Sequence, residues 1–239
     1  LYGKKSLHIL LKKLCEIKGI RWIRVLYCYP EEIYDELIET IRDEKKICHY
    51  LDIPIQHASD RILKRMGRRT SKQELIDIVG KLRKEIPDIV LRTTLITGFP
   101  GETEEDHEEL KEFVDEMEFD RLGVFTYSPE ENTPAAEMAD QVPEEVKEER
   151  RDELMELQQE ISYDKGQDRI GQELLVMIEG KVADESAYIG RTYGDAPKVD
   201  GYIFVQTGEL LMTGDFAKVR VTGALEYDLI GVLSDEYTE

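Results

Sequence analysis

A loop from Thr97 to Thr103 (TGFPGET) is the segment of this sequence best suited to hold a small molecule. It follows a run of strand-forming residues and precedes a helix whose start Thr103 and Asp106 would cap. Two glycines and a proline shape a backbone that a ligand can approach closely, with helix N–H groups behind it. A tight turn between a strand and a helix, without any ligand, explains the same residues equally well. The Lys-Ser/Thr pair of a Walker loop is absent, so that kind of phosphate site is excluded.

The run before this loop, residues 89–97 (IVLRTTLIT), predicts a strand with two different faces. Alternation places Arg92, Thr94 and Ile96 on one face, with leucine and threonine side chains on the other. An arginine in the middle of a strand rarely stays buried without an anionic partner. A ligand carboxylate and a neighbouring glutamate would both satisfy it, so Arg92 predicts either a binding site or an internal ion pair.

A further polar group lies in residues 51–60 (LDIPIQHASD), where a strand ends and a short helix begins. Gln56, His57 and Ser59 are expected at the same edge of the sheet as the glycine-rich loop. A single histidine in such a place is more often a structural residue than a ligand. Neither a carboxylate pair nor a Ser-His-Asp set can be assembled from the sequence, so hydrolase chemistry is disfavoured.

The three cysteines, Cys15, Cys28 and Cys48, are separated by 13 and 20 residues. This spacing matches neither a disulfide framework nor a CxxC-type metal site. Each cysteine has apolar neighbours, which favours buried thiols in a reducing compartment. We therefore expect a cytoplasmic protein.

Charge and hydropathy exclude several classes of protein. The 239 residues include 32 Lys and Arg against 52 Asp and Glu, a net charge of −20, which disfavours non-specific binding to nucleic acid and favours a basic partner. No apolar run approaches the roughly 20 residues that cross a bilayer, so we expect no membrane association. The chain starts at Leu1 with neither a signal peptide nor an initiator methionine, which suggests a piece of a longer protein.

The elements that must position these residues alternate between helix and strand over the first two-thirds of the chain. Helices are expected over residues 4–17, from Pro30, from Ser71 to about Pro87 and after Thr103, and strands over residues 22–28, 50–54, 89–97 and 121–127. Such spacing predicts parallel βαβ units, either in a barrel or in an open doubly wound sheet, with the chemistry at the carboxyl edge. Four strands complete neither fold, which again suggests missing N-terminal sequence.

A change of pattern divides the chain into two domains. Residues 143–164 are highly charged and carry an apolar stripe at Val146, Leu154, Leu157 and Ile161, which predicts a helix on the outside of the first domain or a connector. From Gly171 onward, short alternating runs are broken by Gly and Asp, which predicts a small antiparallel β-barrel. We place the two domains at residues 1–168 and 169–239.

Several motifs, in a consistent order, resemble the radical S-adenosylmethionine methylthiotransferases. They are DIPIQHASDRILKRMGR (residues 52–68), RTTLITGFPGET (92–103) and FTYSPEENTPA (125–135), followed by the small terminal barrel. Within the barrel, GRTYGDAP (190–197) and VDG (199–201) resemble the RimO branch of that family. Members of this branch methylthiolate the β-carbon of an aspartate on the twelfth small-subunit ribosomal protein. The MiaB branch, which modifies a transfer-RNA adenosine, carries a different pattern here.

The resemblance implies an α/β fold, namely the last four strands of a partial radical-SAM (β/α) barrel, followed by a TRAM-like β-barrel. It also implies S-adenosylmethionine and two 4Fe–4S clusters in the full-length enzyme. In the family, a CxxxCxxC loop holds one cluster and three cysteines of a preceding domain hold the other. Neither cysteine set exists in this chain, so we expect no metal ligand, no catalytic residue and no activity in the chain alone.

The resemblance and the strand parity together identify candidate site residues. Those expected to bind the cofactor are Gln56, Arg92, Thr94, Ile96, Thr97, Gly98, Pro100, Gly101 and Tyr127. Arg92 would pair with the methionyl carboxylate, which suits a planar guanidinium, and the backbone around Ile96 to Gly98 would hold the adenine edge. Tyr127 and Ser128 would line the mouth of the site. Those expected to bind the substrate are Arg191, Tyr193, Asp195 and Asp200.

The charge of the terminal barrel bears on the choice of partner. TRAM domains often bind RNA, but residues 171–239 hold five basic and thirteen acidic residues, a net charge of −8. An acidic barrel suits a basic ribosomal protein of the small subunit through electrostatic steering, although acidity for solubility alone is the simpler alternative. Two other functions stay open. One is a transfer-RNA methylthiotransferase, for which a basic barrel would be the signature, and the other is a non-catalytic module that docks the ribosomal protein.

Overall fold

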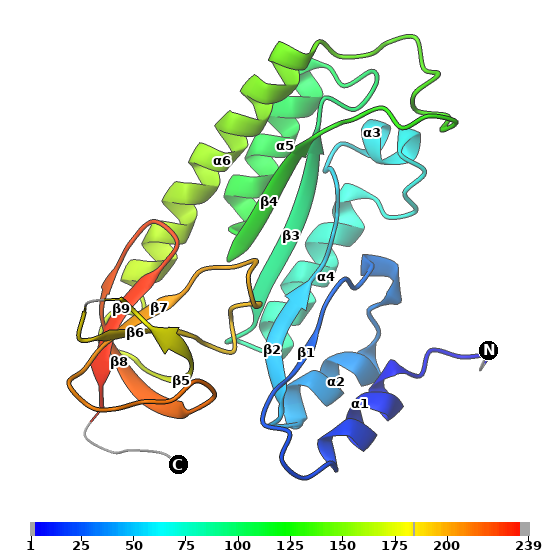
Figure 1. Cartoon of the computed structure of the whole chain (residues 1–239). Helices are drawn as coiled ribbons and strands as arrows, with labels where there is room; N and C mark the ends of the chain where they lie inside the picture. Colours follow the sequence, from blue (N-terminus) through cyan, green and yellow to red (C-terminus); the bar gives the residue numbers. More distant parts are fainter. Residues whose placement is uncertain (1–2, 184, 235–239) are drawn as a thin grey trace. The chain divides into compact units, whose positions relative to one another are not determined.

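Four parallel strands form the sheet of the first unit, Leu1–Gln158, in a computed structural model that describes residues 3–183 and 185–234 (Figure 1). They are β1 (Ile23–Val25), β2 (Ile47–Asp52), β3 (Val90–Thr97) and β4 (Arg121–Thr126), and they lie in sequence order across the sheet. Every neighbouring pair is parallel, and helices connect the strands, which confirms the predicted βαβ units. The carboxyl ends of the strands therefore meet at one edge of the sheet.

Helices precede or follow each strand of this unit. They are α1 (Leu7–Cys15), the 3-10 turn η1 (Pro30–Glu32), α2 (Asp35–Asp43), α3 (Asp60–Arg65), α4 (Lys72–Glu85), α5 (Glu104–Met117) and α6 (Glu144–Gln167). Capping boxes start two of them as predicted, with Ser71 accepting from the backbone N–H of Glu74 in α4 and Thr103 from that of Asp106 in α5. Within residues 3–183 and 185–234, no helix combines the length and the apolar character needed to cross a membrane.

Strand β3 has one buried face and one half-buried face. Leu91 and Leu95 are fully buried, whereas Arg92, Thr94 and Ile96 keep partial exposure, which confirms the predicted alternation. The core of the unit is made of large side chains from the strands and from the helices α2 to α5: Leu37, Ile38, Tyr50, Leu51, Ile62, Leu75, Leu82 and Phe113. The half-buried face of β3 is thus the side on which polar groups can collect.

The first strand is shorter than the sequence predicts. A strand was expected over residues 22–28, but β1 covers only Ile23–Val25. Tyr27 has a φ of +59°, which lies outside the extended region, and the side chains of Leu26 and Tyr27 are exposed. A run of β-forming residues does not reveal such a left-handed residue, so the prediction was wrong at this end.

Two other predicted boundaries shift. The second strand occupies Ile47–Asp52 rather than residues 50–54, because Pro54 has no N–H to continue the ladder. The helix expected from Pro30 is a single 3-10 turn, and the α-helix begins only at Asp35. Both shifts leave the order of the elements as predicted.

The second unit, Gln159–Glu239, contains a closed barrel of five strands in the order β5-β6-β7-β9-β8 (Figure 1). They are β5 (Glu173–Lys181), β6 (Ala187–Arg191), β7 (Ile203–Gln206), β8 (Phe216–Ala224) and β9 (Leu229–Leu233). All neighbours are antiparallel except β7 and β9, which are parallel. A closed ring with an odd number of strands cannot alternate in direction throughout, so one parallel pair is required. The predicted small antiparallel barrel is confirmed with this one exception.

Helix α6 confirms the helix predicted over residues 143–164, but its buried stripe differs from the predicted one. The buried side chains are Lys147, Arg150, Leu154, Gln158, Ile161 and Ser162, whereas Val146 and Leu157 stay half-buried. Four polar residues therefore occupy positions that an apolar pattern would not assign to the interior. The division into compact units falls between Gln158 and Gln159, inside this helix, and the boundary at residues 168 and 169 remains a prediction.

Candidate functional site

Arg92 lies on the half-buried face of β3 and pairs with an acidic residue of the neighbouring strand. Its Nη1 is 3.0 Å from Oδ1 of Asp52, and the two side chains are 15% and 12% exposed. The same Nη1 donates to Oγ1 of Thr94 at 3.3 Å. The register of β2 and β3 sets Asp52 opposite Arg92. Of the two partners that the sequence left open, the structure shows the internal ion pair, with an aspartate rather than a glutamate.

Gln56 joins this strand face through its backbone. Its N–H donates to the carbonyl of Thr94, and its carbonyl accepts from the N–H of Ile96, both at 2.9 Å. Gln56 has a φ of +72°, which turns the chain after β2 so that this isolated bridge can form. Its side-chain Oε1 is buried and has no hydrogen-bond partner among the described residues. An acceptor in that condition points to a group that the described chain does not itself supply.

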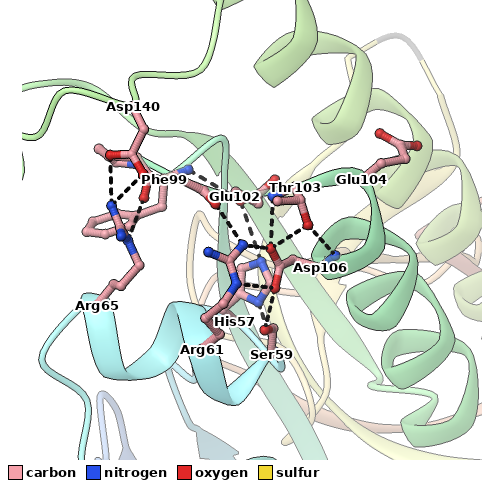
Figure 2. A network of polar contacts seen from close by, with 12 residues as sticks. His57, Ser59, Arg61, Arg65, Phe99, Glu102, Thr103, Glu104, Asp106 and Asp140 are labelled. Atoms are coloured by element: carbon pink, nitrogen blue, oxygen red, sulfur yellow. Dashed lines mark hydrogen bonds and ion pairs between the residues drawn. The ribbon is translucent and has the colours of Figure 1, made fainter.

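The carboxylate of Glu102 organises the glycine-rich turn (Figure 2). Its Oε2 accepts from the backbone N–H of Gly98 at 2.8 Å and of Phe99 at 3.3 Å. Its Oε1 accepts from Nη1 of Arg150, on α6, at 2.9 Å. Both Glu102 and Arg150 are buried. The turn thus folds around a carboxylate of its own and uses its N–H groups to do so.

His57 completes this buried cluster. Its Nδ1 accepts from the N–H groups of Ala58 and Ser59, each at 3.0 Å, so this nitrogen carries no proton and the ring proton resides on Nε2. Nε2 lies 3.5 Å from Oε2 of Glu102, at the outer limit of a hydrogen bond. Burial alone would raise the pKa of Glu102, but His57, the Gly98 N–H and Arg150 outweigh it and lower that pKa. The structural interpretation of His57 is supported by these contacts.

Asp106 is a second carboxylate that ties separate elements together (Figure 2). It accepts from Oγ of Ser59 at 2.7 Å, from the N–H and Oγ1 of Thr103 at 2.8 and 2.9 Å, and from Arg61 of α3. Burial alone would raise the pKa of Asp106, but these hydrogen bonds outweigh it and hold that pKa well below its usual range. The start of α3 is therefore fixed against the start of α5.

Both glycines of the turn are required by the packing of the chain itself. At Gly98, with a φ of +70°, an added Cβ would lie 2.1 Å from Cγ of Lys147. At Gly101, with a φ of +83°, it would lie 2.4 Å from a carboxylate oxygen of Asp140. The hydroxyl of Thr97 already has a partner within the chain, because its Oγ1 donates to the carbonyl of Lys147 at 3.0 Å. Packing within the chain therefore explains both glycines without a ligand, and a ligand at the turn remains a prediction.

Pro100 and Tyr127 complete the surroundings of the turn. Pro100 is buried, and its carbonyl accepts from Nε of Arg65 at 3.0 Å. Tyr127 packs edge-to-face against Phe99, with 5.2 Å between the ring centroids, and Nζ of Lys147 lies 5.5 Å from the Tyr127 centroid. The hydroxyl of Tyr127 is buried without a hydrogen-bond partner among the described residues. Tyr127 and Gln56 thus each present an unsatisfied polar atom.

The cysteines do not form a site. None of the three cysteines forms a disulfide; Cys28 and Cys48 are buried, whereas Cys15 is half-buried, so the prediction of a buried thiol was wrong for Cys15. Burial raises the pKa of Cys28 to about 11. Among residues 3–183 and 185–234, no group of three or more His, Cys, Asp or Glu side chains could hold a metal ion.

The residues predicted to bind the substrate help to build a loop of the barrel. Asp195 is buried and accepts from the N–H and Oγ1 of Thr192 at 3.1 and 2.7 Å. Asp200 accepts from the N–H of Ala196 at 2.8 Å. Arg191 pairs with Glu179 at 2.6 Å. Tyr193, in the same loop, is half-buried. These contacts give the carboxylates a role in folding the loop, and a contact with substrate remains a prediction.

Sequence reasoning missed four residues that build the site, namely Asp52, Glu102, Lys147 and Arg150. Glu102 belongs to the predicted loop, but its type and position alone do not reveal that its carboxylate is buried and accepts from the turn. Lys147 and Arg150 lie in a highly charged run, where an apolar stripe does not reveal buried polar side chains. The spacing of Lys147, Arg150 and Leu154, three and four residues apart, is the signal that could have found them.

Comparison with known proteins adds to this geometry. Residues 3–114 match the family model of the Radical SAM superfamily, and residues 170–233 match that of the TRAM domain. "Ribosomal protein uS12 methylthiotransferase RimO" of Lachnoclostridium phytofermentans is 66% identical over 97% of this chain and 52% of its own length. The protein of that name from Clostridium botulinum is 53% identical over 100% of this chain and 53% of its own length. The chain spans about half the length of these curated relatives.

A solved structure supports the fold. Coproporphyrinogen III oxidase (HemN) from Escherichia coli, a radical SAM enzyme, matches 92% of this chain and 52% of its own chain with a TM-score of 0.56. The sequence identity is 16%, so this likeness concerns the architecture alone. The predicted partial radical-SAM barrel followed by a TRAM-like barrel is confirmed.

Proposed function

The chain belongs to the RimO-type family of radical S-adenosylmethionine methylthiotransferases, and from this we propose that the whole protein transfers a methylthio group to the β-carbon of an aspartate in ribosomal protein uS12. The observation that carries the proposal is 66% identity to a RimO over 97% of this chain. Since the chain covers 52% of that relative, the activity and the substrate are proposed for the whole protein.

The half-buried face of β3 fits S-adenosylmethionine. The buried Oε1 of Gln56 has no partner among the described residues, and an unsatisfied buried acceptor costs about 1–3 kcal/mol unless a ligand or a water donates to it. Thr94 lies opposite Gly123 of β4, and a Cβ at Gly123 would be 3.6 Å from Nη2 of Arg92, so the guanidinium lies beside this pair. We propose that Gln56, Thr94 and Ile96 hold the cofactor and that Arg92 binds its carboxylate beside Asp52.

The residues of the turn pack against other parts of the chain and do not themselves line this face. Thr97, Gly98, Pro100 and Gly101 are packed against the chain's own side chains. We propose that they fix the end of β3, and that Tyr127 contributes its unsatisfied hydroxyl near the turn. When bound at a reduced cluster, S-adenosylmethionine supplies a radical that removes hydrogen from the substrate. The residues of this chain bind and orient the cofactor and exclude water.

The iron–sulfur clusters do not fit the described residues. Cys15, Cys28 and Cys48 are widely spaced, and no metal-binding group occurs among residues 3–183 and 185–234. We propose that the whole protein carries two 4Fe–4S clusters on residues outside this chain. The chain alone would then act as a binding module rather than as a catalyst.

We propose a protein substrate rather than RNA for the barrel. Residues 171–239 carry a net charge of −8, which repels a phosphate backbone and attracts a basic protein. The relatives' name supplies the identity of that protein, and this favours the RimO-type function over the transfer-RNA alternative. Three cysteines without a disulfide suit a reducing compartment, and on this basis we place the protein in the cytoplasm.

Calorimetry on the whole protein, loaded anaerobically with its clusters, tests the cofactor site. The R92K variant should bind S-adenosylmethionine about tenfold or more weakly, because an ammonium cannot replace the planar fork of a guanidinium. The R42K variant is the control, since Arg42 is exposed and pairs with Asp43. Wild-type protein that takes up no cofactor, or equal affinities in the two variants, would contradict the proposal. Stoichiometric iron in the isolated chain after reconstitution would contradict the assignment of the cluster ligands.

A further inference from the structure

The segment between β7 and β8 holds two large apolar side chains in solvent. Leu210 is 90% exposed and Met212 is 73% exposed. Leu211, between them, is 8% exposed and packs into the core of the barrel. Leu211 thus faces the barrel core, while the side chains of its two neighbours lie in solvent. Single exposed apolar residues are ordinary on protein surfaces, but a fixed pair of them is not.

Hydrogen bonds fix this segment at its first half. The hydroxyl of Tyr188 donates to the carbonyl of Glu209 and accepts from the N–H of Leu211, both at 3.2 Å. Tyr188 is itself buried in the barrel core. The backbone on both sides of Leu210 is thus attached to a core side chain.

The second half of the segment is fixed in the same way. The carboxylate of Asp215 accepts from the N–H of Met212 at 2.7 Å, and the N–H of Asp215 donates to the carbonyl of Met212 at 3.0 Å. The N–H of Gly214 donates to the carbonyl of Ile178, and the N–H of Ile178 to the carbonyl of Asp215, both at 2.8 Å. The segment is therefore preorganised, and a partner that binds it loses little affinity in ordering it.

Acidic residues accompany this apolar pair. Glu209 is exposed and Asp215 is half-buried at the two ends of the segment, and no Lys or Arg occurs between Lys198 and Lys218. An apolar centre with a charged rim is the usual anatomy of a protein–protein interface. The sign of the charge selects a basic partner, since an RNA or an acidic protein would be repelled.

We infer that the segment Glu209–Asp215 is a docking site for the basic protein substrate, with Leu210 and Met212 as apolar anchors. Side chains of the substrate cover Leu210 and Met212, and lysine or arginine residues beside them meet Glu209 and Asp215. This inference rests on the proposed function for the statement that the substrate is a protein. It differs from the sequence-based prediction, which placed substrate contacts at Arg191, Tyr193, Asp195 and Asp200.

Binding of purified ribosomal protein uS12 to the whole, cluster-loaded protein tests the inference. The L210S/M212S double variant should bind about tenfold or more weakly, because truncating central anchors of an interface typically has at least this effect. The control is the I170S/L225S double variant, which removes two apolar side chains that are 43% and 46% exposed, one before β5 and one between β8 and β9. It should bind as the wild type does. Circular dichroism should show the same barrel in all three proteins, because the substituted side chains are exposed.

The outcomes separate the docking site from the proposed function. If wild type and L210S/M212S bind uS12 equally while both take up S-adenosylmethionine, the docking site is wrong and the proposed function stands. If the wild-type protein binds no uS12, both are wrong. Two other results would also overturn the inference, provided that uS12 binding is unchanged in L210S/M212S. If the double variant loses a self-association of the wild type, the apolar pair binds a second copy of the chain. If it loses binding to vesicles of anionic phospholipid, the pair binds a lipid surface.

Discussion

Replacement of Glu102 by glutamine gives a sharp test of the buried cluster at the turn. Both carboxylate oxygens accept hydrogen bonds, Oε2 from Gly98 and Phe99 and Oε1 from Arg150. A glutamine keeps one acceptor oxygen and turns the other position into a donor. Whichever way the amide is oriented, its NH₂ group meets N–H donors, and Arg150 or the turn loses its partner.

The expected loss follows from burial. The side chain of Glu102 is 0% exposed and that of Arg150 is 8% exposed. Removing one member of a buried ion pair typically costs about 3–5 kcal/mol of unfolding free energy, because the other charge stays buried. Glu104 provides a matched control, since it pairs with Nη2 of the same Arg150 at 3.1 Å but is 70% exposed. The E104Q variant should lose about 1 kcal/mol or less.

Urea unfolding followed by circular dichroism measures both variants at pH 7, and hydrogen exchange of the Gly98 and Phe99 amides reports the turn directly. The pKa of Glu102 is lowered, so its contribution is present above its ordinary value of 4.5 and is lost as the pH falls through the lowered pKa. The difference between wild type and E102Q should therefore shrink at acid pH. If E102Q and E104Q cost the same at pH 7, or the difference does not shrink, the assignment of this carboxylate is wrong.

Three further predictions concern separate features. G98A should lower the unfolding free energy more than G67A. Both glycines have left-handed backbones, for which an alanine costs about 1–2 kcal/mol, but only at Gly98 would the added Cβ meet a side chain. Equal losses of unfolding free energy in the two variants would contradict this. Iodoacetamide should leave Cys28 unmodified at pH 8 in the native protein, since its pKa is about 11, and mass spectrometry that finds rapid labelling there would refute it. L211A should lower the free energy of unfolding of the barrel, measured by thermal unfolding, by about 2–5 kcal/mol, and L210A by about 0.5 kcal/mol or less. The reverse order would overturn the assigned burial.

Local signals in the sequence predicted much of the fold. The capping boxes at Ser71 and Thr103 each involve residues three positions apart, so they are visible in the sequence and occur as predicted. The faces of β3 follow from alternation within one strand. The end of β1 could not be predicted in this way, because the left-handed Tyr27 interrupts a run with strong β propensity.

Contacts between distant residues account for what the sequence left open. Asp52 and Arg92 are 40 residues apart, and only the register of β2 against β3 brings them together. The sequence predicts that Arg92 has an anionic partner, but it does not identify that partner. Similarly, α6 buries Lys147 and Arg150 because Tyr127, directly after β4, offers its carbonyl to the lysine and Glu102 of the turn offers its carboxylate to the arginine. A helix taken alone contains no sign of these partners.

The buried cluster connects the two segments that carry the proposed cofactor contacts. His57 follows Gln56 directly, and its Nε2 lies 3.5 Å from Oε2 of Glu102, which follows the end of β3, so the two segments meet in this buried cluster (Figure 2). Gln56 combines a buried Oε1 that has no partner among the described residues with a left-handed backbone (φ +72°), a conformation that persists only where the surrounding contacts hold it. The same contacts keep that oxygen ready for a donor. Loosening them in E102Q should therefore weaken cofactor binding in the whole protein even though Glu102 itself lies behind the turn.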